Sequence, residues 1–285
     1  IRLKLNGVTG TFNASDTITL RNDAGTTIAS GTIAANDGTY ITINGQGTGE
    51  FVEAAASTDG KSITVNGDAQ LSTAQKQFGT ASVLFDGTGD DLSLATSSDF
   101  GFGTGDFAVE AFIRPTAITV FDTIFDFRTA NPEVALVISI NSSGQIVVNV
   151  NGSNVISGGT VTINTWAHIA VSRVSGVTSL FVNGSRVGSA YTDTNDYGST
   201  KTLKIGRAYD GGNAFAGYID EVRISKGVGR YANAASITVP TTAFVADVNT
   251  SLLIHADGLS GSTQILDGGI TSVSYTHLTL PTSRS

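Results

Sequence analysis

Apolar and polar residues alternate with a period of two along most of the chain, which is the pattern of half-buried β-strands. Between residues 107 and 115, Phe107, Val109 and Ile113 fall on one face of such a strand, whereas Glu110 falls on the other. The same pattern predicts strands at residues 134–140, 145–150, 167–174 and 178–184. Each pair of neighbouring strands is separated by Gly, Asn or Ser, so antiparallel hairpins are expected.

The spacing of these turn signals predicts an antiparallel β-sandwich of the jelly-roll type over residues 55–250. Beyond a small, polar boundary at residues 54–60, turn residues recur roughly every 8 to 12 positions, as they do in sandwiches and jelly rolls. Within residues 215–224 the apolar phase changes, because Ile219 and Val222 are three positions apart and cannot share one face of a regular strand. A β-bulge near Asp220 and Glu221 would reconcile them.

Residues 1–54 are predicted to form a small β-repeat domain of their own. Short alternating segments at 17–20, 26–30 and 39–43 are separated by Asn, Asp and Gly, which favours a meander of hairpins. Gly10 and Phe12 recur as Gly49 and Phe51, 39 residues later. This unit resembles the small β repeats of phage tail and fibre proteins; the simpler interpretation is a β extension without a function of its own.

Composition limits the partners and the chemistry. The net charge is -8, so the field of the protein repels nucleic acid and anionic membrane surfaces. No apolar run approaches the ~20 residues of a membrane-spanning helix. The chain has no Cys, which excludes disulfides, thiol catalysis and thiolate metal sites, and no Met, from which we expect it to be a piece of a longer protein.

Four segments in order resemble laminin-G-like jelly-roll modules of the concanavalin-A-like lectin/glucanase superfamily. They are FGTASVLFDGTGDDLSL (78–94), FAVEAFIRP (107–115), WAHIAVSRVSGVTSLFVNG (166–184) and LKIGRAYDGGNAFAGYIDEVRIS (203–225). The resemblance implies a non-catalytic module of the kind found in tandem in phage tail and bacterial surface proteins. Its expected partners are surface glycans or neighbouring modules, and its expected location is the virion or the cell surface.

The C-terminal part of the chain extends this resemblance. Residues 226–258 resemble the segment that links tandem copies of such modules, and residues 251–272 are predicted to begin an incomplete further repeat. Residues 273–285, VSYTHLTLPTSRS, resemble the translated remnant of a sequencing adapter found at the ends of assembled metagenomic reading frames. They are predicted to be a non-native tail that takes no part in the fold; a genuine disordered tail is the alternative.

Catalysis is not expected. Glucanases with this fold carry an E-x-D-x-x-E strand whose carboxylates lie on one sheet face, about 5 to 5.5 Å apart in retaining enzymes. No Glu of this chain has that spacing, no G-x-S-x-G motif is present, and the three histidines lack a compact metal-binding spacing. His168 and Trp166 are interpreted as structural residues of one strand, although an exposed Trp166 would be able to stack on a sugar.

Calcium is the expected small partner, because Asp and Asn in loops at the rim of a sandwich supply the oxygen ligands that it prefers. The predicted metal ligands are Asp86, Asp90, Asp91 and Asp220. Related modules hold calcium at the rim. The alternative for each residue is an aspartate that accepts a hydrogen bond within its own turn.

Tyrosines beside acidic loops are the candidates for carbohydrate binding, since a hydroxylated ring next to carboxylates and amides is common in sugar sites. The predicted residues are Tyr191, Asp193, Asn195, Asp196, Tyr197, Tyr209, Asp210 and Asn213. The function expected from sequence is glycan contact through these rim loops in a virion or cell-surface protein. The alternative is an accessory carbohydrate-binding domain of a secreted polysaccharide-degrading enzyme.

Overall fold

The computed structural model of the chain describes residues 2–4, 17–21, 27–36, 40–44 and 61–268. The four N-terminal segments are the strands β1 (Arg2–Lys4), β2 (Thr17–Arg21), β3 (Thr27–Asn36) and β4 (Tyr40–Asn44). They pair antiparallel in the order β1-β4-β3-β2, so the three predicted strands of this region are present. Whether they form a separate repeat domain stays a prediction, and the repeated Gly and Phe positions and the predicted tail at 273–285 lie outside the described residues.

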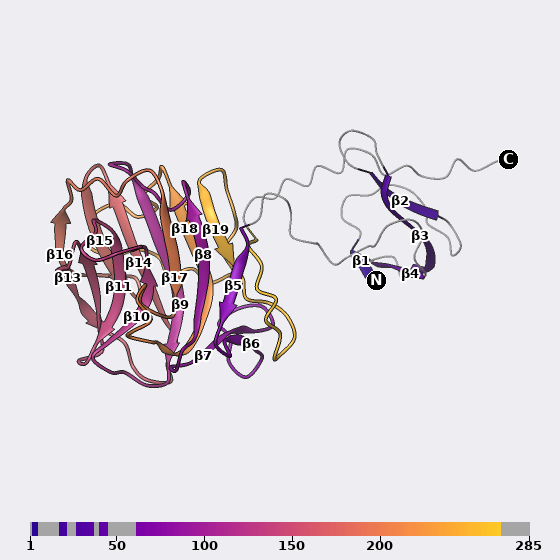
Figure 1. Cartoon of the computed structure of the whole chain (residues 1–285), viewed down its shortest axis with the longest axis horizontal. Helices are drawn as coiled ribbons and strands as arrows, with labels where there is room; N and C mark the ends of the chain where they lie inside the picture. The colour runs from indigo at the N-terminus through magenta and orange to yellow at the C-terminus, as the bar shows by residue number, and fades with distance from the viewer. Residues whose placement is uncertain (1, 5–16, 22–26, 37–39, 45–60, 269–285) are drawn as a thin grey trace. The chain divides into compact units, whose positions relative to one another are not determined.

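Residues 61–268 form an antiparallel β-sandwich, as predicted, in which two sheets pack face to face (Figure 1). The seven-stranded sheet has the order β13-β12-β11-β10-β17-β8-β5. Its strands are β5 (Ile63–Asn66), β8 (Asp91–Ser97), β10 (Phe121–Asp126), β11 (Leu136–Asn141), β12 (Gln145–Val150), β13 (Ser153–Thr160) and β17 (Lys201–Ile205).

The eight-stranded sheet has the order β16-β15-β14-β9-β18-β7-β6, with β19 as an additional neighbour of β18. Its strands are β6 (Gln70–Ser72), β7 (Ser82–Asp86), β9 (Phe107–Pro115), β14 (Ala167–Val174), β15 (Val177–Val182), β16 (Ser185–Thr192), β18 (Ala216–Lys226) and β19 (Thr250–Ile254). The hairpins predicted from the alternating pattern, β11–β12 and β14–β15, are both confirmed.

The core lies between the sheets and is built from the inward positions of every strand. On β9, Phe107, Val109 and Ile113 point inward, as the alternation predicted. Phe107 stacks on Phe102 with ring centroids 4.5 Å apart, and Phe102 in turn contacts Phe127 at 5.4 Å. Because each buried aromatic ring contributes roughly 1.5 to 3 kcal/mol of transfer free energy, this cluster is a main source of the stability of the sandwich.

The outer face of the eight-stranded sheet is covered by residues 227–249, here called the connector. The hydroxyl of Tyr231 donates to Glu110 Oε2 (2.6 Å), and Phe244 lies against Phe112 with centroids 6.1 Å apart. Glu110 is therefore completely buried although it lies on the polar side of its strand. Burial alone would raise its pKa, but hydrogen bonding with His168, the charge of Arg223 and the bond from Tyr231 hold the pKa below its usual value.

The predicted β-bulge is confirmed at Asp220 and Glu221 in the middle of β18. The register of β18 against β9 shifts between Asp220 and Arg223, and Glu221 has a φ of 51°. The bulge turns both carboxylates to neighbouring loops. Asp220 Oδ2 accepts the backbone N–H groups of Gln77 (2.8 Å) and Phe78 (3.1 Å), and Glu221 Oε2 accepts that of Phe244 (2.7 Å).

The predicted boundary at residue 250 does not end the sandwich. Residues 251–272 were expected to begin a further repeat, but β19 (Thr250–Ile254) pairs antiparallel with β18 as a strand of this sandwich. The C-terminal half of β18 extends past the residues that pair with β7, which leaves an edge for β19. Leu252 and Ile254 fill the core there, and Asp267 Oδ1 accepts the N–H of Leu253 (3.0 Å).

Candidate functional site

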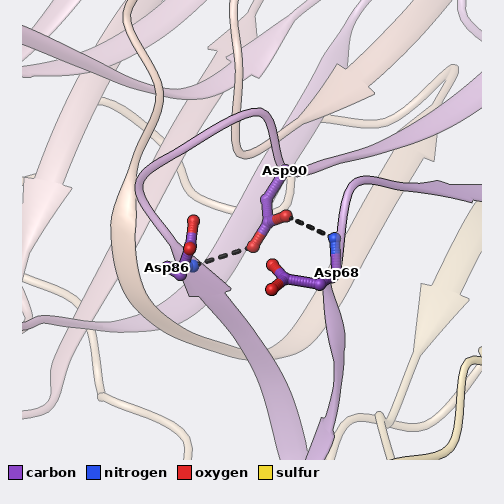
Figure 2. A group of neighbouring side chains, drawn as sticks. All are labelled: Asp68, Asp86 and Asp90. Carbon is purple, nitrogen blue, oxygen red and sulfur yellow. Dashed lines mark hydrogen bonds between the residues drawn. The ribbon is translucent and has the colours of Figure 1, made fainter.

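Three aspartates gather where β7 and β8 meet the loop before β6 (Figure 2). Asp90, fully buried, accepts the backbone N–H groups of Asp68 and Asp86, each at 2.8 Å. Asp86 and Asp68 are exposed, and one carboxylate oxygen from each of the three lies within 4.8 Å of the others. Burial raises the pKa of Asp90 while these backbone bonds lower it, with a net shift above its usual value. This acidic triad could hold a metal ion through oxygen ligands.

A close backbone approach brings the triad together. Gly67, at a φ of +70°, precedes Asp68, and a Cβ at this position would lie 2.2 Å from Asp90 Oδ1. Sequence reasoning identified Asp86 and Asp90 but missed Asp68, which is 18 positions before Asp86 and joins them only through the pairing of β6 with β7. The Gly67-Asp68 turn was a signal that could have been used.

The other two predicted metal ligands, Asp91 and Asp220, do not join the triad, so the four predicted ligands do not gather at one place. Asp91 follows Asp90 directly, so the alternation of the strand turns it to the opposite face, where it lies 3.3 Å from Lys204 Nζ. Asp220 is fully buried at the bulge of β18, and its oxygens accept backbone N–H groups. Neither carboxylate is among the described groups that could share an ion.

The predicted sugar-binding residues fall into two groups that cannot form one site. Residues 191–197 precede β17 and residues 209–213 follow it, so the two groups lie at opposite ends of this five-residue strand, which is itself roughly 15 Å long.

In the first group, Asp193 and Tyr197 are buried, and the Tyr197 hydroxyl donates to Asp193 Oδ2 (2.9 Å), so neither side chain is open to a ligand at the surface. Burial and the charge of Asp193 raise the pKa of Tyr197. Tyr191 and Asn195 are partly buried and hydrogen-bonded to each other (3.1 Å), and Asp196 is exposed and caps a turn at Gly198.

The second group lies at a groove of about 430 Å³ on the outer face of the seven-stranded sheet. The groove crosses four adjacent strands, β10, β11, β12 and β13, and its volume falls within the range of small-molecule and sugar sites. It is lined by Phe121, Thr123, Arg128, Asn131, Val137, Ser139, Asn149, Gly152, Asn154 and Asn213. Asn213 is the one predicted residue among them; Tyr209 and Asp210 belong to the loop that carries it.

The charged corner of the groove is held by one buried carboxylate. Asp126 accepts three bonds from the guanidinium of Arg128, from Nε to Oδ1 (2.9 Å) and Oδ2 (3.1 Å) and from Nη2 to Oδ2 (2.6 Å), and also one from the N–H of Tyr209 (2.9 Å). The same guanidinium lies 4.6 Å from the centroid of the Tyr209 ring. The bonds to Asp126 raise the pKa of Arg128. Tyr209 therefore supports the wall of the groove through Arg128.

Sequence reasoning missed most of the groove. Asn149 and Asn154 form a cross-strand pair, Asn149 Nδ2 donating to Asn154 Oδ1 (2.9 Å), and Ser139 lies on the neighbouring strand. Ser139 and Asn149 interrupt apolar strands on the face away from the core, so the polar residue in QIVVNV was a usable signal. Which strands lie side by side depends on the topology, which the sequence pattern does not show. The prediction therefore placed the binding site on the turn-rich loops.

The fold and the groove together define an all-β sandwich with a polar groove on one sheet face. The chain belongs to the family described as the concanavalin A-like lectin/glucanases superfamily, which it matches over residues 86–230, just over half of its length. No curated protein sequence matches it significantly. Among the described residues, no helix is of the long, apolar kind that would cross a membrane.

Several solved structures are similar to the chain. Domain 4 of the extracellular arabinanase AbnA from Geobacillus stearothermophilus, solved with arabinotriose, has 18% identity and a TM-score of 0.45, with 59% of this chain and 82% of that chain covered. A putative carbohydrate binding protein from Bacteroides ovatus has 17% identity and a TM-score of 0.44, covering 84% and 64%. A SAP-like pentraxin from Limulus polyphemus has 18% identity and a TM-score of 0.36, covering 55% and 75%.

Proposed function

We propose that this chain is a non-catalytic glycan-binding module of a virion or cell-surface protein. The observation that carries the proposal is the groove across β10–β13, which combines four asparagine side chains, two hydroxyls and an exposed aromatic ring. The proposed contact surface is thus a sheet face, with the loop of residues 209–213 at its edge, and the loop of residues 191–197 has no part in it.

The chemistry of the lining suits a sugar. An asparagine amide both donates and accepts hydrogen bonds, as a sugar hydroxyl does, so each amide can pair with hydroxyls in either direction. Phe121 is 38% exposed at one end of the groove, where the apolar C–H face of a sugar ring would cover it.

What supports binding over hydrolysis is the lining of this groove. None of its described residues is an Asp or a Glu. Hydrolysis of a glycosidic bond normally needs two carboxyl groups that flank the scissile bond, so a glycan held here would not be cleaved. The acidic triad is proposed to take Ca²⁺, because hard carboxylate oxygens suit this ion. It contributes no residue to the groove.

The experiment is affinity gel electrophoresis of the full chain in gels that contain single polysaccharides. Wild-type protein is compared with the double variant Asn149→Ala/Asn154→Ala and with the matched control Asn195→Ala from the loop before β17. We expect retardation of wild type and of the control by at least one polysaccharide, and loss of retardation in the double variant. Equal retardation of all three proteins, or none with any polysaccharide, would refute the proposed site or the proposed function respectively.

A further inference from the structure

We infer that the groove across β10–β13 selects uncharged glycans and binds them without a divalent cation. The inference rests on the proposed function and specifies the chemical class of its ligand. It follows from how the charged and polar groups at the groove are already partnered.

The lining offers no free positive charge to an acidic sugar. Arg128 is the single Lys or Arg among the described lining residues, and its side chain is only 18% exposed. Its three bonds to Asp126 occupy the Nε/Nη2 edge of the guanidinium, which is one of the two edges that can bind a carboxylate or sulfate in a bidentate way. The pair is neutral, and replacing Asp126 by a ligand carboxylate would leave that buried aspartate without its cation.

An exposed aspartate in the loop beside the groove disfavours an anion further. Asp210, in the loop that carries Asn213, is exposed and uses one oxygen to accept the N–H of Gly212 (3.0 Å). Glu133, in the loop beside Asn131, has its charge paired with Lys201 Nζ. Arg207 donates Nε to the carbonyl of Gly211 in the same loop (2.6 Å) and lies 3.9 Å from Asp91. With Arg128, Glu133 and Arg207 each beside an opposite charge, Asp210 adds an exposed negative charge, in a chain whose net charge is already -8. A uronic or sulfated polysaccharide would meet repulsion there.

The remaining polar groups are neutral and retain bonding capacity. The bond between Asn149 Nδ2 and Asn154 Oδ1 uses one donor and one acceptor, so each amide keeps polar atoms that it can direct to a ligand. Thr123 and Ser139 add hydroxyls on the two neighbouring strands. Because adjacent strands are about 4.8 Å apart, these groups extend over roughly 14 Å, which is longer than one sugar ring.

A bridging cation has no ligands in the groove. Calcium-dependent sugar binding needs carboxylates that hold the ion next to the sugar hydroxyls, and the described lining contains none. The acidic triad is separate from the lining, so Ca²⁺ bound there would not touch a ligand in the groove. Removing divalent cations should therefore leave glycan binding unchanged even if it affects stability.

The test uses the full chain and two sets of polysaccharides in affinity gels, each with Ca²⁺ and with excess EDTA. Dextran, mannan, galactan and laminarin form the uncharged set; polygalacturonate, alginate and chondroitin sulfate form the acidic set. We expect retardation by one or more uncharged polymers, a change of less than about twofold in EDTA, and no retardation by the acidic set. The double variant Asn149→Ala/Asn154→Ala should bind about tenfold more weakly, the loss expected for two hydrogen bonds.

The outcomes separate the inference from the proposed function. Retardation by the acidic set alone, or binding that EDTA abolishes, would overturn the inference and leave glycan binding in place. Absence of retardation by both sets would overturn both. As a guard against misfolding of the double variant, Phe121→Ala at the exposed end of the groove is the second variant, and Asn195→Ala is the control. Uncharged binding that survives both groove variants would also overturn the inference.

Discussion

Asp220 shows how a single buried carboxyl group makes the stability of this fold depend on pH. It lies at the bulge of β18 without exposure to solvent, and burial, together with the nearby charge of Glu221, raises its pKa to about 7 despite backbone bonds from Gln77 and Phe78. In the unfolded chain the same group ionises near pH 4. Between these values the folded protein holds a proton that the unfolded chain has released, so rising pH favours unfolding.

We therefore expect the free energy of unfolding to fall between pH 4 and 7, by at most about 1.4 kcal/mol per pH unit from this group. His255, whose pKa is raised by its bond to Glu221, adds a loss in the same direction as pH rises through its own, higher range. Urea denaturation at several pH values checks this. The variant Asp220→Asn should flatten the slope below pH 7, and a slope equal to that of wild type would contradict the assignment.

The acidic triad leads to a second prediction for single residues. If Asp68, Asp86 and Asp90 share Ca²⁺, millimolar Ca²⁺ should stabilise the folded state by about 2 to 3 kcal/mol once it exceeds the dissociation constant about a hundredfold. Differential scanning calorimetry should show a rise of several degrees in Tm. Asp68→Asn should abolish the rise, whereas Asp196→Asn, which changes an exposed turn aspartate elsewhere, should keep it. A rise retained in Asp68→Asn would exclude the triad.

At the scale of elements, β13 packs closely against β15 and β16 at one edge of the sandwich, and a glycine of β13 makes this close packing possible. Gly159 on β13 has a φ of +61°, and a Cβ there would lie 2.7 Å from the Cβ of Val182. Gly152, in the turn before β13, has a φ of +76° but no atom within 4 Å of the equivalent position. The two glycines share the same backbone demand and differ in the space around them.

This pair separates backbone strain from steric conflict. Gly152→Ala should cost about 1 kcal/mol of stability, the price of a left-handed conformation. Gly159→Ala should cost that amount plus roughly 1 to 3 kcal/mol for pushing β13 away from β15. Chemical denaturation of both variants gives the difference directly. Equal losses of stability in the two variants would contradict this account, because they would mean that β13 can move away from β15 without a loss of free energy.

The connector is held to its sheet by buried charge. Glu110 accepts from Arg223 (Nη2 to Oε1, 2.8 Å) and from Tyr231, with all of its surface covered. Glu110→Gln should destabilise the protein by about 3 to 5 kcal/mol, because Arg223 loses its buried partner. Asp247→Asn breaks the pair with Arg230 at a carboxylate that is 47% exposed, and should cost less than about 1 kcal/mol. Similar losses in the two variants would contradict this account of the connector.

At the scale of the whole molecule, the alternating pattern predicted the layers and the strands. It did not predict which outward-facing side chains are exposed to solvent and which are covered by other segments. The pattern placed Glu110 on the polar face of its strand, yet Glu110 is buried beneath the connector. The sequence pattern did not indicate Asn149 and Asn154 as a site, because they come together only through the pairing of β12 with β13. Burial of Asp193 and Tyr197 likewise depends on contacts with Arg173 and Thr178, which are distant in sequence.

The predicted site residues that do lie together are those that local geometry joins. Asp86 and Asp90 were identified because a single turn brings them together, and local geometry is readable from sequence. Asp68 and the asparagines of the groove are joined across strands, so their proximity follows from register and strand order. The residues 209–213 were identified as part of a loop, and the topology decided that this loop borders the groove.

The most direct test of the central claim is a titration of the ¹⁵N-labelled chain with an uncharged oligosaccharide taken from the polymer that it binds. The side-chain amide signals of Asn149, Asn154 and Asn213 report on the groove, and the backbone signals of residues 191–197 report on the rival loop. We expect saturable shifts of the groove amides with the loop signals unchanged. Shifts confined to residues 191–197 would contradict the account.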